Sequence, residues 1–207
     1  MPASRTCSRR CDLNQRVLEA LATADAFGSL GSATGERRAD IWMAGAVARN
    51  RPGQLPGMIF GAQAPQLPGM TEWDETVADL WATGISPEGH PVEFLRADLD
   101  RRGAVRSADL RDMADGAKVV VAGLVTHRQR PATAVGVTFV NLEDETGFTN
   151  VVVSIGAWKR YRRILQGEPA LLVAGRLERS EDDVVNVVLE RVQPLPVVVH
   201  SRSRDFC

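Results

Sequence analysis

The sequence predicts an α+β protein in which a helical N-terminal half is followed by a five-stranded antiparallel β-barrel. The chain has 207 residues, a length that suits one medium-sized domain or two small ones. Hydrophobic residues make up 44% of the chain and charged residues 25%, the balance of a folded soluble protein rather than a disordered one. From Lys118 onward, the spacing of hydrophobic residues changes from the helical period to the alternation of strands.

Four helices are expected in the N-terminal half, over residues 13–26, 36–48, 72–82 and 91–102. The first has its leucines and one valine on a single face, with Asp12 as the expected N-cap. Thr71 is the expected N-cap of the third helix. Between the second and third helices, residues 50–71 contain four prolines and four glycines, which indicates a linker.

Five strands are expected in the C-terminal half, over residues 118–130, 136–144, 148–154, 170–179 and 184–193. A helix is expected over residues 155–165, between the third and fourth strands. Gly123, in the middle of the first strand, indicates a bulge or a sharp bend. Five short antiparallel strands with a helix at this position match the OB-fold, a small Greek-key barrel.

Charge and composition support a modular chain. Residues 1–52 carry a net charge of +3, residues 53–117 of −6 and residues 118–207 of +2. The expected segments are a disordered tail (1–11), a helical segment (12–49), the linker (50–71), a helical connecting segment (72–117), the barrel (118–193) and a C-terminal tail (194–207).

The sequence contains no recognisable signal for membrane insertion, secretion, or the binding of a metal or cofactor. The apolar runs are far shorter than the roughly 18 residues of a membrane span, and the N-terminus has no signal-peptide pattern. The three cysteines form no disulfide framework, so we expect a cytoplasmic protein. We expect neither a metal nor a cofactor, because no histidine or cysteine has partners at ligand spacing and no phosphate-binding loop is present.

The end of the first strand is the first candidate contact with nucleic acid. OB-folds bind oligonucleotides on the face of strands 2 and 3 and through neighbouring loops. His127, Arg128 and Arg130 lead into the first of these loops, where the two arginines could pair with phosphates. The alternative is a solvated strand end in a protein whose basic residues are nearly all arginine.

Phe139 and Phe148 are the candidate stacking platforms, since a base stacks on an aromatic ring without a sequence match. Alternation places Asn141 on the same face as Phe139, where its amide could hydrogen-bond a base. If that face is instead the barrel interior, Phe139 is a core residue.

The helix after the third strand carries further cations, of which Lys159, Arg160 and Arg163 are candidate contacts with nucleic acid. Their spacing is equally typical of a solvated outer helix face, which is the favoured interpretation; a duplex backbone or a partner protein is the alternative. The acidic triplet of residues 143–145 is interpreted as a solvated turn, because adjacent strand residues face opposite sides and converge poorly on Mg²⁺.

Several segments closely resemble the C-terminal region of the bacterial C-family, alpha-subunit-like, error-prone DNA polymerases. The pattern consists of AGLVTHRQRP, GVTFVNLEDETG, ALLVAGRLE and SRSRDF in the C-terminal half. Upstream, LEALATADAFGSLG resembles the end of the family's helix-hairpin-helix region, and DLWATGISPEGHPVEFLRADLDRRGA the segment that joins it to the OB domain. The resemblance covers residues 12–206 and makes residues 12–49 a remnant of the helix-hairpin-helix region.

The resemblance implies a module that binds single-stranded template DNA in damage-induced, mutagenic translesion synthesis. It also implies two protein partners, a Y-family-like adaptor and the sliding clamp. The family's palm, with its metal-binding aspartates, has no counterpart here, so we expect the chain alone to be no enzyme, as a truncated or C-terminal piece of such a polymerase. The alternatives are an OB-fold module that contacts only proteins and a gene remnant without a function of its own.

Overall fold

The computed structural model consists of two compact units, Met1–Pro87 and Glu88–Cys207. It describes residues 11, 13–30, 36–48, 64–131, 136–180, 184–197 and 204–206. Of the tail predicted for residues 1–11, all but Cys11 lies outside the described residues. Asp12 and most of the predicted linker also lie outside them.

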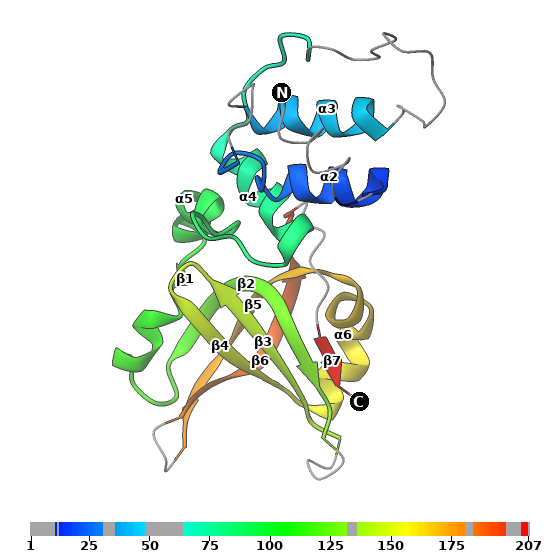
Figure 1. Ribbon diagram of the computed structural model, residues 1–207. Coiled ribbons are helices and arrows are strands. Elements are labelled where there is room, and N and C mark those ends of the chain that lie inside the picture. Colours follow the sequence, from blue (N-terminus) through cyan, green and yellow to red (C-terminus); the bar gives the residue numbers. More distant parts are fainter. Residues whose placement is uncertain are drawn as a thin grey trace, which may run out of the picture. The chain divides into compact units, whose positions relative to one another are not determined.

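The first unit contains the helices α2 (Gln15–Thr23), α3 (Arg37–Ala48) and α4 (Glu72–Thr83) (Figure 1). Helix α2 begins at Gln15 rather than at residue 13, because the side chain of Asn14 accepts a hydrogen bond from the Val17 N–H and caps the helix there. Helix α4 begins as predicted, with a capping box in which Thr71 and Asp74 each accept the other's backbone N–H.

Helices α2 and α3 pack together through a small core of Leu18, Ala22, Phe27 and Ala44. The Arg37 guanidinium extends this contact to α4, because it donates to the carbonyl oxygen of Thr23 and to a carboxylate oxygen of Asp79. Burial of one small apolar cluster and this buried arginine therefore holds the three helices together.

The second unit opens with a connecting segment. Its elements are η1 (Glu93–Leu95), α5 (Arg96–Arg101), β1 (Ala104–Val105) and η2 (Ala108–Asp112). The helix predicted over residues 91–102 is thus a 3-10 turn followed by a short α-helix.

The barrel follows. Its strands are β2 (Lys118–Gln129), β3 (Thr138–Asp144), β4 (Gly147–Val153), β5 (Ala170–Arg179) and β6 (Val185–Pro194). Helix α6 (Ile155–Gly167) comes after β4 and before β5, and a last strand, β7 (Arg204–Phe206), pairs with β2.

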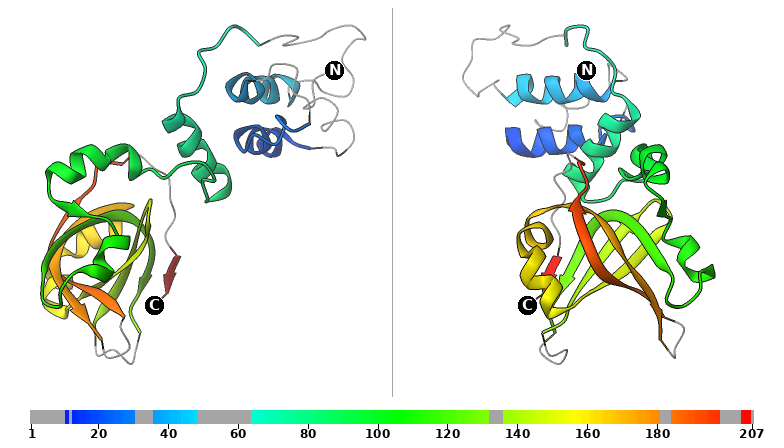
Figure 2. Two further views of the ribbon diagram at one scale, coloured as in Figure 1. Left: turned by 90° about the vertical axis from the view of Figure 1, so that its left-hand side faces the viewer. Right: turned by 180° about the vertical axis from the view of Figure 1, so that it is seen from behind.

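The five strands close into a barrel in the order β2-β3-β4-β6-β5, with β5 pairing back to β2 (Figures 1 and 2). The prediction of a fully antiparallel barrel is wrong, because β4 and β6 run parallel, with Asn150 opposite Asn186. Strands β1 and β7 also run parallel to β2. Alternation shows that a segment is a strand but not which strand it pairs with, so the sequence does not reveal this parallel seam.

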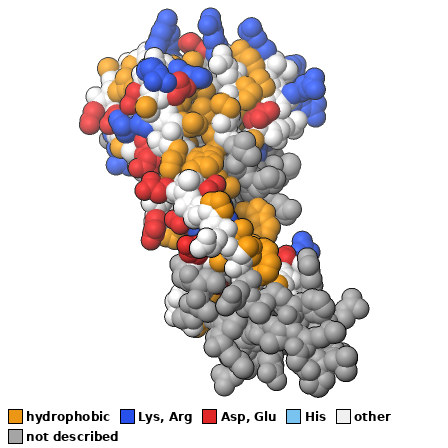
Figure 3. Space-filling view, turned by 90° about the horizontal axis from the view of Figure 1, so that it is seen from above, with side chains coloured by type: hydrophobic (Ala, Val, Ile, Leu, Met, Phe, Trp, Pro, Cys, Tyr) orange, Lys and Arg blue, Asp and Glu red, His pale blue; other side chains and the backbone are white. Residues whose placement is uncertain are grey.

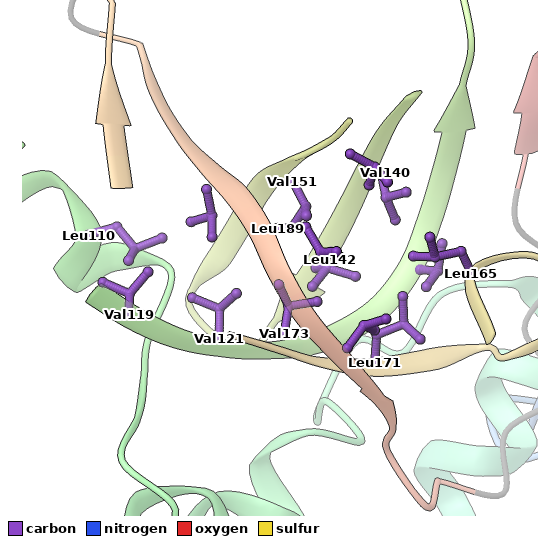
Figure 4. Close-up of a cluster of buried hydrophobic side chains, with 14 of the residues drawn as sticks. Leu110, Val119, Val121, Val140, Leu142, Val151, Leu165, Leu171, Val173 and Leu189 are labelled. Atoms are coloured by element: carbon purple, nitrogen blue, oxygen red, sulfur yellow. The ribbon is translucent and has the colours of Figure 1, made fainter. Parts of the chain in front are cut away.

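The barrel encloses one hydrophobic core (Figure 4). Strand residues fill it from all sides, and Leu165 of α6 and Leu110 of η2 close its ends. Two glycines allow backbones to approach closely: a Cβ on Gly123 would lie 2.7 Å from the Glu143 carbonyl oxygen, and one on Gly175 would lie 2.2 Å from that of Val188. The irregularity in β2 falls between Val125 and His127, so Gly123 marks a close approach rather than the bulge.

On the face shown in Figure 3, basic, acidic and hydrophobic side chains are interspersed over the described residues. Among the described residues, no helix has both the length and the apolar character needed to cross a membrane.

Candidate nucleic-acid interface

Strand β3 separates its side chains cleanly between the core and the outer surface. Val140 and Leu142 are buried in the core, whereas Phe139, Asn141 and Glu143 are only partly buried and lie on the opposite face. The alternative that Phe139 is a core residue therefore does not hold. Strand β4 repeats the pattern with an outward Phe148, which is 64% exposed, and an outward Asn150.

The strand register aligns four polar residues in one row across the outer face. His127 of β2 lies opposite Asn141, Asn141 lies opposite Asn150, and Asn150 lies opposite Asn186 of β6. The Asn150 side-chain N–H donates to the Asn186 side-chain oxygen at 2.5 Å. We call Asn141, Asn150 and Asn186 the amide row.

The two candidate aromatic platforms lie on opposite sides of the amide row. Phe139 lies two residues before Asn141 along β3, opposite Val152 of β4. Phe148 lies two residues before Asn150 along β4, opposite Glu143. Because the two strands are antiparallel, these offsets point in opposite directions, and the amides lie between the rings.

Arg128 does not share this face. Its register partner is the buried Val140, so alternation turns it toward the end of the barrel that α6 covers. There its guanidinium donates from Nε to the Leu165 carbonyl oxygen at 2.6 Å and from a terminal nitrogen to the Glu168 carbonyl oxygen at 2.7 Å. A cation at the C-terminal carbonyls of a helix stabilises it, which gives Arg128 a structural task.

The remaining predicted cations are exposed. Arg130 follows the end of β2. Lys159, Arg160 and Arg163 lie on the solvated side of α6, where Arg160 also stacks on the Tyr161 ring at 5.3 Å. The helix face opposite contributes Leu165 to the core.

Glu143 places a carboxyl group on the outer face. Partial burial raises its pKa above the ordinary value, an effect that His127 partly offsets. A carboxylate here repels phosphate, so the charge of Glu143 opposes the binding of a polyanion next to Phe148.

The rest of the acidic triplet is not a solvated turn, contrary to prediction. Asp144 is buried and accepts hydrogen bonds from the backbone N–H groups of Ser107, Thr146 and Gly147. Glu145 forms a two-pronged ion pair with the buried Arg96, with both N–O distances 2.7 Å. The triplet thus fastens the connecting segment to the β3–β4 turn, a role that sequence spacing alone does not reveal.

In the described part of the chain, no cluster of three or more histidine, cysteine, aspartate or glutamate side chains is arranged to hold a metal ion. His90 lies near the Arg96–Glu145 pair, and its Nδ1 accepts the Val92 N–H. Burial lowers the pKa of His90, although the neighbouring carboxylates of Glu145 and Asp144 oppose this shift.

The sequence reasoning missed Asn150 and Asn186. Both occupy outward positions of strands that were predicted, so alternation carried a signal for each. Asn150 aligns with Asn141 through the antiparallel pairing of β3 with β4, whereas the place of Asn186 beside them depends on the parallel pairing of β4 with β6, which was not predicted.

Comparison with known proteins agrees with the fold of the barrel. The model of the OB-fold nucleic acid binding domain family, tRNA_anti-codon, matches residues 119–195. An error-prone DNA polymerase of Nocardia farcinica is 52% identical over 202 residues, and one of Mycobacterium bovis is 48% identical over 197 residues. Each match covers 95% of this chain and 18% of the relative.

Among solved structures, asparaginyl-tRNA synthetase from Pyrococcus horikoshii is similar over 46% of this chain and 24% of its own, with 20% identity and a TM-score of 0.39. The chain is a homologue of the error-prone DNA polymerases that corresponds to a C-terminal region of these longer proteins, and it contains an OB-fold nucleic acid binding domain.

Proposed function

We propose that this chain is a module that binds single-stranded DNA, the template strand of an error-prone polymerase. The observation that carries the proposal is the outer face of β3 and β4, where Phe139 and Phe148 flank the amide row. Each base stacked on an aromatic ring contributes about 1–3 kcal/mol without regard to sequence. A template-binding module needs this tolerance, because it must accept every sequence.

Phosphate contacts come from cations at the margin of this face. Arg130 is the residue that follows the last residue of β2, three positions beyond His127, which lies opposite Asn141. Lys159, Arg160 and Arg163 form a second cationic surface on α6. Arg128 is not included, because its guanidinium is bonded to the carbonyl groups of Leu165 and Glu168.

On this proposal the chain does not synthesise DNA by itself, since it corresponds to only 18% of its polymerase relatives. It acts in the cytoplasm beside a palm domain, in mutagenic synthesis across damaged template. The sliding clamp and a Y-family-like adaptor are the proposed protein partners.

A salt titration tests the proposal. Binding of the full chain to a labelled single-stranded oligonucleotide is measured over a range of salt concentrations. We expect log affinity to fall linearly with log salt, with a slope of about −0.7 for each phosphate neutralised. A duplex of the same length is the control and should bind less tightly, because its bases are not available for stacking. Absence of binding at low salt would overturn the proposal.

The second candidate is a module that contacts only proteins. The carboxylate of Glu143 on the same face as the aromatic rings favours it, because that charge opposes a polyanion. The large exposed surface of Phe148 is equally suited to an apolar contact with a protein. If this candidate is correct, the chain binds a protein partner but shows no salt-dependent affinity for DNA.

A further inference from the structure

We infer that the amide row of Asn141, Asn150 and Asn186 contacts the edges of unstacked DNA bases, so that the module binds the bases and not only the phosphate chain. The inference rests on the proposed function and adds to it a subsite on three strands. It assigns to β6, the strand of Asn186, a part in binding that the aromatic rings of β3 and β4 do not require.

The register of the three strands is the first observation that supports this inference. Asn141 lies opposite Asn150 and Asn150 opposite Asn186, so the three amides project from the same side of three neighbouring strands. Directly opposed residues have Cβ atoms about 4.5–5.5 Å apart. The row therefore extends about 10 Å across the sheet, the breadth of one or two bases.

The hydrogen bonding of the amide row is the second observation that supports the inference. The Asn150 N–H donates to the Asn186 side-chain oxygen, which leaves the Asn150 oxygen as an acceptor and the Asn186 NH₂ group as a donor. Within the described part of the chain, the Thr126 hydroxyl donates to the backbone carbonyl oxygen of Asn141, whereas the Asn141 side-chain amide makes no hydrogen bond. The row thus presents donors and acceptors side by side, as the edges of bases do.

The position of the aromatic rings is the third observation that supports the inference. Each phenylalanine lies two residues from an asparagine on its own strand, a separation of about 6.6 Å along the strand. A base stacked on Phe139 or Phe148 therefore has its edge within reach of the row. Since amides accept and donate at once, they can bond more than one base, in keeping with a module that must tolerate every sequence.

A comparison of normal and abasic DNA tests the inference. The full chain is titrated with a single-stranded oligonucleotide and with an abasic oligonucleotide that has the same number of phosphates. The variants are Asn141→Ala and the double variant Asn150→Ala/Asn186→Ala, which removes the bonded pair together and leaves no amide without its partner. Gln193→Ala is the matched control, because it removes an exposed amide near the far end of β6.

We expect the unsubstituted chain to prefer normal DNA to abasic DNA. Each row variant should reduce that preference about tenfold, with unchanged binding to abasic DNA and an unchanged salt slope. Gln193→Ala should bind as the unsubstituted chain does. A purely structural role of the row would lower the melting temperature and weaken binding to both ligands equally.

The outcomes separate the inference from the proposed function. If the chain binds neither oligonucleotide, the proposed function fails. If it binds both and the row variants keep the full preference for normal DNA while remaining folded, the inference is overturned and the proposed function stands. If a row variant fails to fold, the other variant decides the question.

Discussion

The guanidinium of Arg128 and the carbonyl oxygen of Leu165 lie 2.6 Å apart, and this contact ties the end of β2 to the end of α6. This contact distinguishes Arg128 from Arg130, although the two arginines look equivalent in the sequence. Arg128 bonds to two carbonyl groups of the barrel unit, whereas Arg130 is exposed and is the arginine proposed to contact phosphate.

Arg128→Ala should lower the free energy of unfolding by about 1–3 kcal/mol, because two carbonyl groups lose a charged donor. Thermal or denaturant unfolding measures the loss. Arg162→Ala is the matched control: its guanidinium bonds only to the exposed Gln166 within the described residues, and its removal should change stability by less than about 0.5 kcal/mol. Equal stability of the two variants would contradict a capping role for Arg128.

Phe148→Ala should weaken binding to single-stranded DNA by about 1–3 kcal/mol, the contribution of one stacked base. The ring is 64% exposed, so its loss should leave the melting temperature nearly unchanged. Fluorescence anisotropy with a labelled oligonucleotide measures the affinity. Phe148→Trp serves as the control and should retain binding, since it keeps an aromatic face. A folded Phe148→Ala variant that binds normally would rule out this ring as a platform.

Glu143→Gln should stabilise the fold near pH 7 and increase DNA affinity. Partial burial raises the pKa of Glu143 in the folded chain, so its ionised form costs stability at neutral pH. Below the ordinary pKa of 4.5, the carboxyl group is protonated in the folded and unfolded chains alike, and the advantage of the variant should vanish. Unfolding curves at pH 7 and pH 4 test the sign, with Glu178→Gln as an exposed control.

Arg96→Ala should destabilise the second unit by about 3–5 kcal/mol, because it leaves the carboxylates of Glu145 and Asp144 without their buried cation. Arg101→Ala, five residues on, removes a pair with Asp98 in which the arginine side chain is 74% exposed, and it should cost less than about 0.5 kcal/mol. Denaturant unfolding compares the two variants. Comparable losses would show that the buried network contributes no more than a surface ion pair.

Gly175→Ala should destabilise the barrel by about 1–3 kcal/mol or prevent its closure, since the added methyl group would lie 2.2 Å from the Val188 carbonyl oxygen. Gly156→Ala, in the first turn of α6, meets nothing within 4 Å and should be neutral or stabilising by up to about 1 kcal/mol. The melting temperature should therefore fall in Gly175→Ala and stay the same or rise in Gly156→Ala. A stable Gly175→Ala barrel would show that β5 and β6 can separate.

Most elements of the barrel could be predicted from the sequence because their signals are local. Strand β5 spans Ala170–Arg179, the range predicted, and Thr71 caps α4 as its position indicated. The missed elements have no local signal. Strands β1 and β7 have two and three residues, and only their pairing with β2 defines them as strands.

The residue types of the candidate site could be predicted from the sequence, but the arrangement of these residues in space could not. Alternation correctly placed Phe139 and Asn141 on one face. It could not show that this face is outside the barrel, that Arg128 turns toward α6, or that Asn150 meets Asn186, because each depends on pairing between distant segments. The buried role of Asp144 and Glu145 depends likewise on the connecting segment, 37 residues away at the Ser107–Asp144 bond.

The parallel seam between β4 and β6 also bears on how the chain folds. Strands β2, β3 and β4 form one local meander and β5 and β6 one hairpin, so the seams β4·β6 and β2·β5 join pieces that form separately. Contacts of long sequence separation slow folding. Closure should thus be the late step in refolding, and until it occurs the unpaired edges of β4 and β6 can add strands from other chains, which makes this stage the one most exposed to aggregation.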